Sequence, residues 1–322
     1  MVSPNRYIRR LKERIRLDRK TFILYSVLRT LVILAAVRSF LMQNYEAVAL
    51  CILSLVLFLL PSFFEDKMKV KIPPLFEAVI YLFIYAAEIL GEVNHYYTRI
   101  PGWDTMLHTL NGFLCAAIGF SMVEILNQHS KRIRLSPIYL SVVAFCFSMT
   151  IGVCWEFIEF AADHFFFLDM QKDFTVTTIG SVTLDPTNSQ IPVRVSDIVK
   201  TVIYTASGET YTIDGGYLDI GINDTMKDLF VNLIGAVVFS TIGYFYESHR
   251  WKQSGKIVNG LTLRKYTDEE LADEEKEINL RMQEVRKERQ KRLKDMTESM
   301  TETWRNEPDD SDENPADRNP ML

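Results

Sequence analysis

The sequence predicts an all-α integral membrane protein with six transmembrane helices and a small β-rich extracytoplasmic insert between helices 5 and 6. Of its 322 residues 48% are hydrophobic and 24% are charged, and the two kinds are segregated along the chain. Apolar runs fill most of residues 21–247, whereas both ends are densely charged. Six of these runs reach the roughly 20 residues that a helix needs to cross the hydrocarbon core of a bilayer.

The six predicted spans follow one another closely, except for a long connection between the fifth and the sixth. They are Thr21–Phe40, Tyr45–Phe64, Pro74–Glu92, Thr105–Asn127, Pro137–Phe160 and Thr225–Tyr246. Short loops that are rich in lysine and arginine stay in the cytoplasm. Such residues gather before the first span, in the second and fourth connections and after the sixth span. Both termini are therefore predicted to be cytoplasmic.

The two ends of the chain are predicted to lie in the cytoplasm with different partners. Residues 1–20 are basic and place Ile8, Leu11 and Ile15 on one helical face, the pattern of an amphipathic helix on anionic lipid. A topogenic charge cluster is the alternative. Residues 248–322 are predicted to be helical from 266 to about 300 and then disordered, because the last segment is rich in aspartate and proline. This tail is expected to recruit a cytoplasmic protein partner.

The long fifth connection, residues 168–221, differs in composition from the spans around it. Its runs of β-branched and aromatic residues predict three or more short strands, including a hairpin around Ser207-Gly208. The insert is either a lid over a site on the outer face or an ornament that contributes only folding contacts.

Composition excludes one class of partner and one class of metal site. The chain has 36 basic against 41 acidic residues, a net charge of −5, so it lacks the basic surface of a nucleic-acid-binding protein. Its partners are expected to be membrane lipids instead. The four cysteines all fall within spans without a C-x-x-C spacing, so neither a disulfide framework nor a thiolate zinc site is predicted.

Ionisable side chains gather where four of the spans reach the outer face. Nine residues are involved, eight of them carboxylates: Glu88, Glu92, Asp104, His108, Glu156, Glu159, Asp163, Asp224 and Asp228. Spacings of three and four residues place the members of each span on one helical face. Each buried charge at a helix centre costs roughly 2.5–3.5 kcal/mol on insertion scales, which calls for a partner or a use.

A divalent metal is one compact way to compensate so many carboxylates, and protons are the other. One imidazole with several carboxylates and no thiolate suits zinc, manganese or iron. The predicted metal ligands are His108, Glu156, Asp228, Asp104 and Asp224, and the predicted catalytic residues are Glu88 and Glu159. Asp104 and Asp224 have an alternative interpretation as caps of the helices that they begin.

Two further features of the spans concern packing. Asn111-Gly112 in the fourth span and Asn232 with Gly235 in the sixth predict a close approach of these helices, with an amide hydrogen bond between them. Arg29 lies near the middle of the first span, and no acid is found at its depth in the sequence.

Three blocks carry a resemblance to a known family. The first block is LGEVNHYYTRIPGWDTMLHTLNGF, with Trp103, Asp104 and His108. The second is GVCWEFIEFAAD, with Trp155, Glu156 and Glu159. The third is DTMKDLFVNLIGA, with Asp224, Asp228 and Asn232. They resemble the uncharacterised bacterial inner-membrane family exemplified by YjdF, and more loosely the VanZ-like teicoplanin-resistance membrane family. The resemblance covers about residues 20–247 and implies a bacterial plasma membrane protein. It supports the fold and the choice of residues, and implies no reaction.

Three functions compete on these observations. The first is a metal-dependent hydrolase or transferase that acts on a lipid or a cell-envelope precursor, with the insert controlling access. The second is a proton- or cation-coupled transporter, against which count the one-sided position of the cluster and the lack of an internal repeat. The third is a non-catalytic membrane scaffold or sensor that acts through its cytoplasmic tail.

Overall fold

The computed structural model describes residues 19–129, 135–249 and 254–267, and in the tail residues 270, 276, 280, 283, 287 and 290. Residues 1–18 of the predicted amphipathic segment and most of the predicted tail helix lie outside these residues. Residues 266–322 form a unit separate from the rest of the chain. The division of the chain into a basic segment, a membrane domain and a tail therefore stays a prediction.

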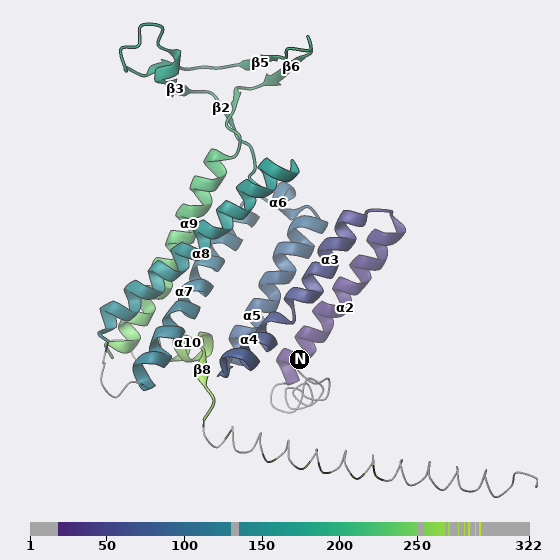
Figure 1. Ribbon diagram of the computed structural model, residues 1–322, viewed down its shortest axis with the longest axis vertical. Helices are drawn as coiled ribbons and strands as arrows, with labels where there is room; N and C mark the ends of the chain where they lie inside the picture. The colour runs from purple at the N-terminus through teal and green to yellow at the C-terminus, as the bar shows by residue number, and fades with distance from the viewer. Residues whose placement is uncertain are drawn as a thin grey trace, which may run out of the picture. The chain divides into compact units, whose positions relative to one another are not determined.

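The chain is mostly helical, as predicted (Figure 1). The helices are α2 (Arg19–Leu41), α3 (Tyr45–Leu57), α4 (Leu60–Met68), α5 (Pro74–Ile84), the π-helix η1 (Tyr85–Val93), α6 (Tyr96–Arg99), α7 (Trp103–His129), α8 (Pro137–Phe166), α9 (Ile222–Glu247) and α10 (Ser254–Leu261). Six stretches within the described residues are long and apolar enough to cross a membrane: Lys20–Leu41, Tyr45–Glu65, Pro74–Val93, Trp103–Asn127, Pro137–Phe166 and Ile222–Glu247.

Two of the six spans are built from two helices each. The second span consists of α3 and α4, which are separated at Phe58 and Leu59. Pro61 explains the break, because proline has no N–H to continue the helical hydrogen bonding of the preceding turn. The third span continues from α5 into η1 without leaving the helical path. The fifth span differs from the prediction at its end, because α8 runs on to Phe166 rather than stopping at Phe160.

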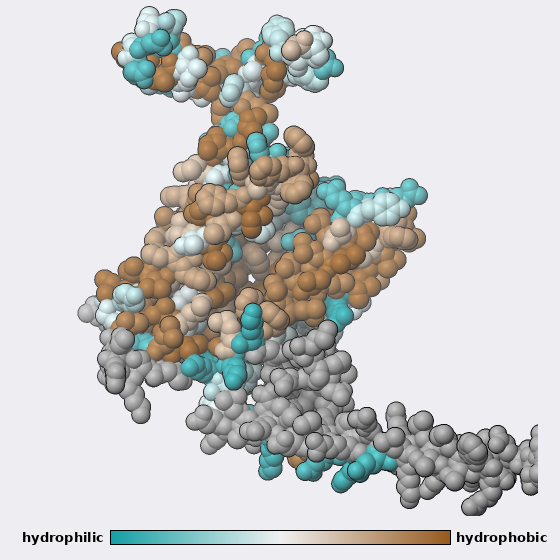
Figure 2. Space-filling view, in the orientation of Figure 1, coloured by the Kyte–Doolittle hydropathy of each residue, from teal (hydrophilic) through white to brown (hydrophobic). Residues whose placement is uncertain are grey.

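The spans pack as two groups of helices. One group is α2, α3, α5 and η1, and the other is α7, α8 and α9, whose members all contact one another. The first core includes Val32, Cys51, Phe58 and Tyr81. Apolar side chains also cover the outside of the helices (Figure 2), which is the surface that a bilayer requires.

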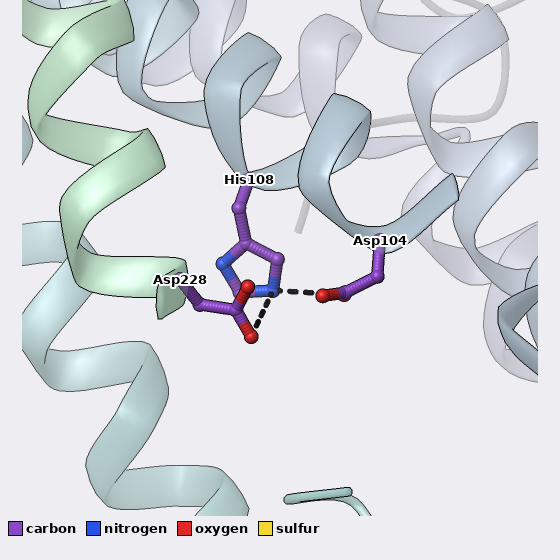
Figure 3. A group of neighbouring side chains, drawn as sticks. All are labelled: Asp104, His108 and Asp228. Carbon is purple, nitrogen blue, oxygen red and sulfur yellow. Dashed lines mark ion pairs between the residues drawn. The ribbon is translucent and has the colours of Figure 1, made fainter. Parts of the chain in front are cut away.

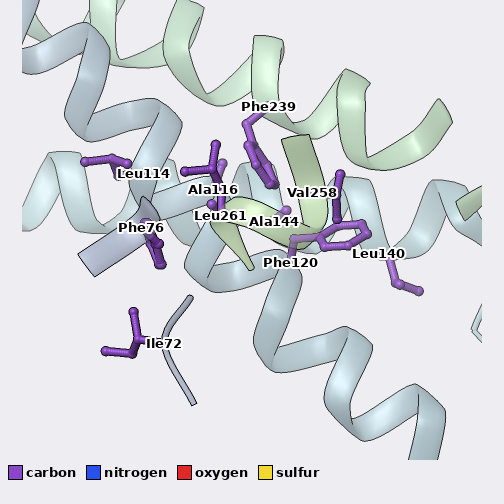
Figure 4. Close-up of a cluster of buried hydrophobic side chains, with 11 residues drawn as sticks. Ile72, Phe76, Leu114, Ala116, Phe120, Leu140, Ala144, Phe239, Val258 and Leu261 are labelled. Carbon is purple, nitrogen blue, oxygen red and sulfur yellow. The ribbon is translucent and has the colours of Figure 1, made fainter. Parts of the chain in front are cut away.

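The second core lies toward the end of α9 and is closed by α10 (Figure 4). Phe120 and Phe239 have no exposed surface, and their rings meet at an angle of 72° with centroids 6.1 Å apart. Phe113 packs edge-on against Phe239 at 5.1 Å. We call this end of the bundle the α10 side, and the end where α8 stops and α9 begins the insert side.

Small residues bring α7 and α9 into backbone contact, as predicted. A Cβ on Gly112 would lie 2.8 Å from the carbonyl carbon of Asn232, and a Cβ on Gly235 would lie 2.7 Å from the backbone nitrogen of Phe113. Asn111 Nδ2 donates a hydrogen bond to Asn232 Oδ1 at 3.3 Å, which confirms the predicted amide bond between the two helices. This close crossing fixes the separation of the side chains one turn nearer the insert side.

The insert consists of short antiparallel pairs of strands, as its composition predicts. Three pairs are formed by β2 (Thr175–Val176) with β7 (Tyr217–Leu218), β3 (Ile179–Ser181) with β4 (Val193–Val195), and β5 (Lys200–Tyr204) with β6 (Thr210–Asp214). The 3-10 helix η2 (Val182–Leu184) follows β3, and a fourth pair joins β1 (Val70–Lys71) to β8 (Arg264–Lys265) near α10. The turn between β5 and β6 contains Gly208 with φ +88°, which confirms the predicted hairpin.

Arg29 finds a partner that its sequence environment does not reveal. Its Nη1 donates to the hydroxyl of Tyr25, one turn back along α2, at 3.3 Å. The Tyr25 ring in turn packs against Tyr81, whose hydroxyl donates to Glu77 Oε1 at 2.7 Å. The arginine thus extends toward the start of α2, away from the insert side, in the manner of a long basic side chain that reaches for the interface.

Candidate functional site

Three side chains from α7 and α9 meet at the insert side (Figure 3). Asp104 and His108 lie one turn apart on α7, and Asp228 faces them from α9. Figure 3 shows both aspartates turned toward the same ring nitrogen of His108. The distance from His108 Nε2 is 3.3 Å to Asp104 Oδ1 and 3.8 Å to Asp228 Oδ2. One atom of each residue lies within 4.8 Å of the other two, and we call these residues the His–Asp triad.

The other ring nitrogen of His108 faces the third helix of the group. Nδ1 lies 3.9 Å from Oε1 of Glu156, which projects from α8 and is only 4% exposed. The second carboxylate oxygen, Oε2, is buried without a hydrogen-bond partner among the described residues. Glu156 therefore approaches the histidine from the side opposite the two aspartates.

Lys227 is the cation of the site. Its Nζ lies 3.1 Å from Asp104 Oδ2, 3.1 Å from Asp224 Oδ1 and 3.5 Å from Asp228 Oδ1. Even so, Oδ1 of Asp228 accepts no hydrogen bond within the described part of the chain, although this side chain is almost fully buried. Desolvated carboxylate oxygens are costly unless a proton, a donor or a cation compensates them.

The two remaining predicted metal ligands have other partners as well. Asp224 pairs with Lys227 through Oδ1, while its Oδ2 accepts a hydrogen bond from the backbone nitrogen of Lys172 at 2.8 Å. Glu156 faces Nδ1 of His108, whereas the triad surrounds Nε2. Of the five predicted ligands, the structure thus brings Asp104, His108 and Asp228 together at one point and places the other two beside them.

The predicted catalytic residues, Glu159 and Glu88, lie on different helices, α8 and η1. Glu159 is 8% exposed on α8, where its Oε1 accepts a hydrogen bond from the indole Nε1 of Trp155 at 2.7 Å. Glu88 lies in the first turn of η1. The start of α7 is tied to this π-helix because Trp103 Nε1 donates to the carbonyl of Ala86 at 3.3 Å.

The base of the insert is bound directly to the site. Asp163 at the end of α8 accepts hydrogen bonds from the backbone nitrogens of Met170 and Gln171, at 2.6 and 2.8 Å. The ring of Phe174 lies under Lys227 Nζ, with 5.6 Å between the nitrogen and the ring centroid. The base of the insert therefore contacts the lysine that pairs with the His–Asp triad.

The carboxylate of Asp219 links the base of the insert to the start of α9. Asp219 accepts hydrogen bonds from the backbone nitrogens of Phe174 at 2.7 Å and Asn223 at 3.0 Å. Burial raises the pKa of Asp219, but the hydrogen bonds from Phe174 and Asn223 favour the charged form more strongly and hold the pKa below its ordinary value.

Sequence reasoning missed three contributors to the site. It gave no role to Lys227, although the spacing of three from Asp224 and one from Asp228 already places this lysine at the same end of the span. The spacing of four between Trp155 and Glu159 is likewise a helical contact distance. Phe174 gives no such signal, because its contact with Lys227 depends on how the insert folds back.

The fold and the site together define the class of this molecule. Six apolar helices make it a multi-pass membrane protein, and a His–Asp cluster lies where three of those helices meet. The family model described as "Predicted membrane protein (DUF2238)" matches residues 23–249, and the chain belongs to this family. No curated protein and no solved structure matches the chain. The resemblance to YjdF and to VanZ-like proteins stays a prediction.

Proposed function

We propose that Asp104, His108 and Asp228 bind a divalent metal ion. This set of ligands suits zinc, manganese or iron. The observation that carries this proposal is the convergence of two carboxylates from different helices on one imidazole nitrogen, within 4.8 Å. Ligand atoms about 2.1 Å from a tetrahedral ion lie about 3.4 Å from one another. The separations of 3.3 and 3.8 Å from the imidazole nitrogen to the two carboxylates are close to that value.

Charge and open coordination support the same conclusion. With His108 neutral, the site carries a net charge of −4, because one cation, Lys227, stands beside five carboxylates: Asp104, Glu156, Glu159, Asp224 and Asp228. A divalent ion halves this charge. Three protein ligands leave a coordination position free, which is the arrangement of catalytic rather than structural zinc sites.

Glu156 serves in this proposal to orient the histidine. A metal-binding imidazole commonly donates its other N–H to a carboxylate, which fixes the ring and its tautomer. Glu156 occupies that place at 3.9 Å from Nδ1, and a small rotation of either side chain completes the bond. Asp224 supports the site indirectly, because it holds Lys227 and the base of the insert.

The reaction that we propose is hydrolysis or group transfer on a lipid or cell-envelope precursor. A metal ion at the triad would polarise the ester that is attacked and lower the pKa of a bound water. Glu159 is the favoured general base over Glu88, because it lies on α8, which also carries Glu156 and packs against α7, whereas Glu88 lies on η1. It takes one proton from the attacking water.

The packing beneath the site argues against the transport alternative. A carrier needs a path for protons or cations through the whole bilayer. Below Asn232 the three helices are sealed by Phe113, Phe120 and Phe239, and the last two have no exposed surface. This buried aromatic packing on the α10 side of the site supports chemistry at the insert side rather than passage through the bundle.

The setting of the reaction follows from the topology that the basic residues predict. We propose that the insert side faces outward from a bacterial plasma membrane and that both termini are cytoplasmic. Membrane lipids are then the partners and the source of substrate. Recruitment of a cytoplasmic protein by the charged tail is a separate proposal, and it is the basis of the scaffold alternative.

The test uses full-length protein in detergent, stripped with a chelator and reloaded with zinc, manganese or iron. Release of phosphate from short-chain phosphatidic acid and from a polyprenyl phosphate is measured. We expect activity only after reloading, a loss of about 100-fold or more in Glu159→Gln, as for removal of a general base, and little change in Glu46→Gln at the exposed start of α3. Full activity of the metal-free protein would refute the proposal.

A further inference from the structure

The hairpin formed by β5 and β6 in the insert lacks a core of its own. None of residues 171–215 is buried, and the side chains of Ile203 and Tyr211 are 46% and 55% exposed. Among the described strands, β5 and β6 pair only with each other. An isolated two-stranded hairpin is marginally stable in water, and further strands are usually needed to stabilise it. The hairpin therefore has the character of an incomplete sheet.

The ladder between the two strands determines which backbone groups point outward. At one end the backbone nitrogen of Gly215 donates to the carbonyl of Val199 at 2.8 Å. At the other end that of Thr205 donates to the carbonyl of Glu209 at 3.0 Å. Hydrogen-bonded and non-hydrogen-bonded pairs alternate in an antiparallel ladder, so the even-numbered residues of both strands direct their N–H and C=O groups away from the hairpin. On β6 these residues are Thr210, Thr212 and Asp214.

The two edges of the hairpin differ in what already occupies them. The outward edge of β5 is used within the insert, because the backbone nitrogen of Ile198, just before this strand, donates to the carbonyl of Thr177 at 3.0 Å. No residue in the described part of the chain forms a hydrogen bond with the outward backbone groups of β6. This strand also lacks the lysine, proline or bulge that commonly protects an edge. The edge of β6 is therefore open for pairing.

We infer that β6 pairs with β6 of a second copy of this chain, antiparallel, about a two-fold axis at Thr212. In this register Thr212 faces Thr212 of the partner subunit, and Thr210 faces Asp214 of the partner subunit. The groups that meet are the ones that point outward, so each of the three facing pairs exchanges two hydrogen bonds. The two hairpins then form one sheet with the strand order β5–β6–β6–β5. This inference does not depend on the proposed function.

Side chains and charges complement one another in the same register. Tyr211 and Ile213 lie on one face of β6, because they are two residues apart. Across the axis Tyr211 lies beside Ile213 of the partner subunit, and a pair of an aromatic and a β-branched side chain stabilises a sheet. The one charged residue of β6, Asp214, is opposite Lys200 in its own hairpin and faces the uncharged Thr210 of the partner subunit. No like charges face one another across the contact.

The position of the axis makes Thr212→Cys a direct test. Residues that face each other in a hydrogen-bonded pair have Cα atoms about 5.5 Å apart, a distance that a disulfide spans. Val202→Cys is the matched control, because Val202 is opposite Thr212 on β5. Its distance from Val202 of the partner subunit would be three strand spacings, roughly 14 Å. A dimer joined through β5 would instead place Val202 at the axis.

Each full-length variant is reconstituted in liposomes of phosphatidylethanolamine and phosphatidylglycerol and oxidised with copper phenanthroline. The wild type, whose own four cysteines lie in the spans, gives the background. We expect a disulfide-linked dimer in Thr212→Cys and only the background in Val202→Cys. Cross-linking of Val202→Cys above the background, or of neither variant, overturns the inference.

Thr212→Pro gives a second measurement. The N–H that it removes points away from β5, so the hairpin keeps its own hydrogen bonds, as proline on an edge strand allows. The dimer loses two hydrogen bonds, one from each copy, and we expect its dissociation constant to rise about tenfold or more. Energy transfer between labelled copies in the same liposomes measures this constant. An unchanged constant, or a wild-type protein that is monomeric, overturns the inference.

Discussion

Gly112→Ala is predicted to abolish metal binding although it leaves every proposed ligand in place. The new Cβ would lie 2.8 Å from the carbonyl carbon of Asn232, whereas non-bonded carbons pack at about 3.5–4.0 Å, so α7 and α9 must separate by about 1 Å. His108 and Asp228 lie one turn from this contact on the same two helices. Their separation would grow from 3.8 Å to about 5 Å, beyond the roughly 4.2 Å that two bonds to one ion can span.

Metal content and thermal unfolding of the purified variant measure this effect. We expect stoichiometric metal in the wild type, little in Gly112→Ala, and a loss of stability of about 1–3 kcal/mol from the overpacked contact. Gly255→Ala is the control, because a Cβ there would lie 3.8 Å from the ring of Tyr246, which is an ordinary van der Waals contact. If Gly112→Ala folds and holds the metal with wild-type affinity, the helix crossing does not set the geometry of the triad.

Three further predictions concern the surroundings of the site. Trp155→Phe removes the 2.7 Å hydrogen bond to Glu159, worth about 1.5 kcal/mol, so the hydrolysis rate should fall roughly tenfold at unchanged metal content. Because the pKa of Asp219 is lowered on folding, its contribution to stability is present at neutral pH and is lost as the pH falls below about 3.9. Hydrogen exchange of the Phe174 amide should then accelerate in the wild type, whereas Asp219→Asn should lack this acid-dependent step. Ile220 adopts φ +53°, a backbone conformation that costs a β-branched residue about 1–2 kcal/mol. Ile220→Gly should therefore raise the melting temperature. An unchanged or lower melting temperature would contradict this strain.

Hydrophobic run length and small residues were enough to predict the six spans and one of the contacts between them. The apolar runs predicted the six spans. The contact between α7 and α9 was predicted from Asn111, Gly112, Asn232 and Gly235. The π-helix η1 was not predictable, because its apolar pattern does not differ from that of an ordinary helix over nine residues. Nor did the sequence show how the six spans divide into two groups, since contacts between distant helices leave no periodic signal.

The candidate site was predictable as a set of residues but not as a geometry. Helical spacing placed Asp104 with His108 on one face, and Asp224 with Asp228 on another. Which oxygen faces which ring nitrogen depends on the crossing of α7, α8 and α9. The assignment of roles to Glu88, Glu156 and Glu159 therefore stays a prediction that metal and activity measurements will decide.

The most direct test of the central claim is elemental analysis combined with X-ray absorption spectroscopy of the full-length protein. The account predicts one zinc, manganese or iron ion per chain, with nitrogen and oxygen ligands at about 2.0–2.2 Å and no sulfur. The ion should be absent from folded His108→Ala and Asp228→Asn and present in Glu46→Gln. A folded wild-type protein that binds none of the three metals after incubation would contradict the account.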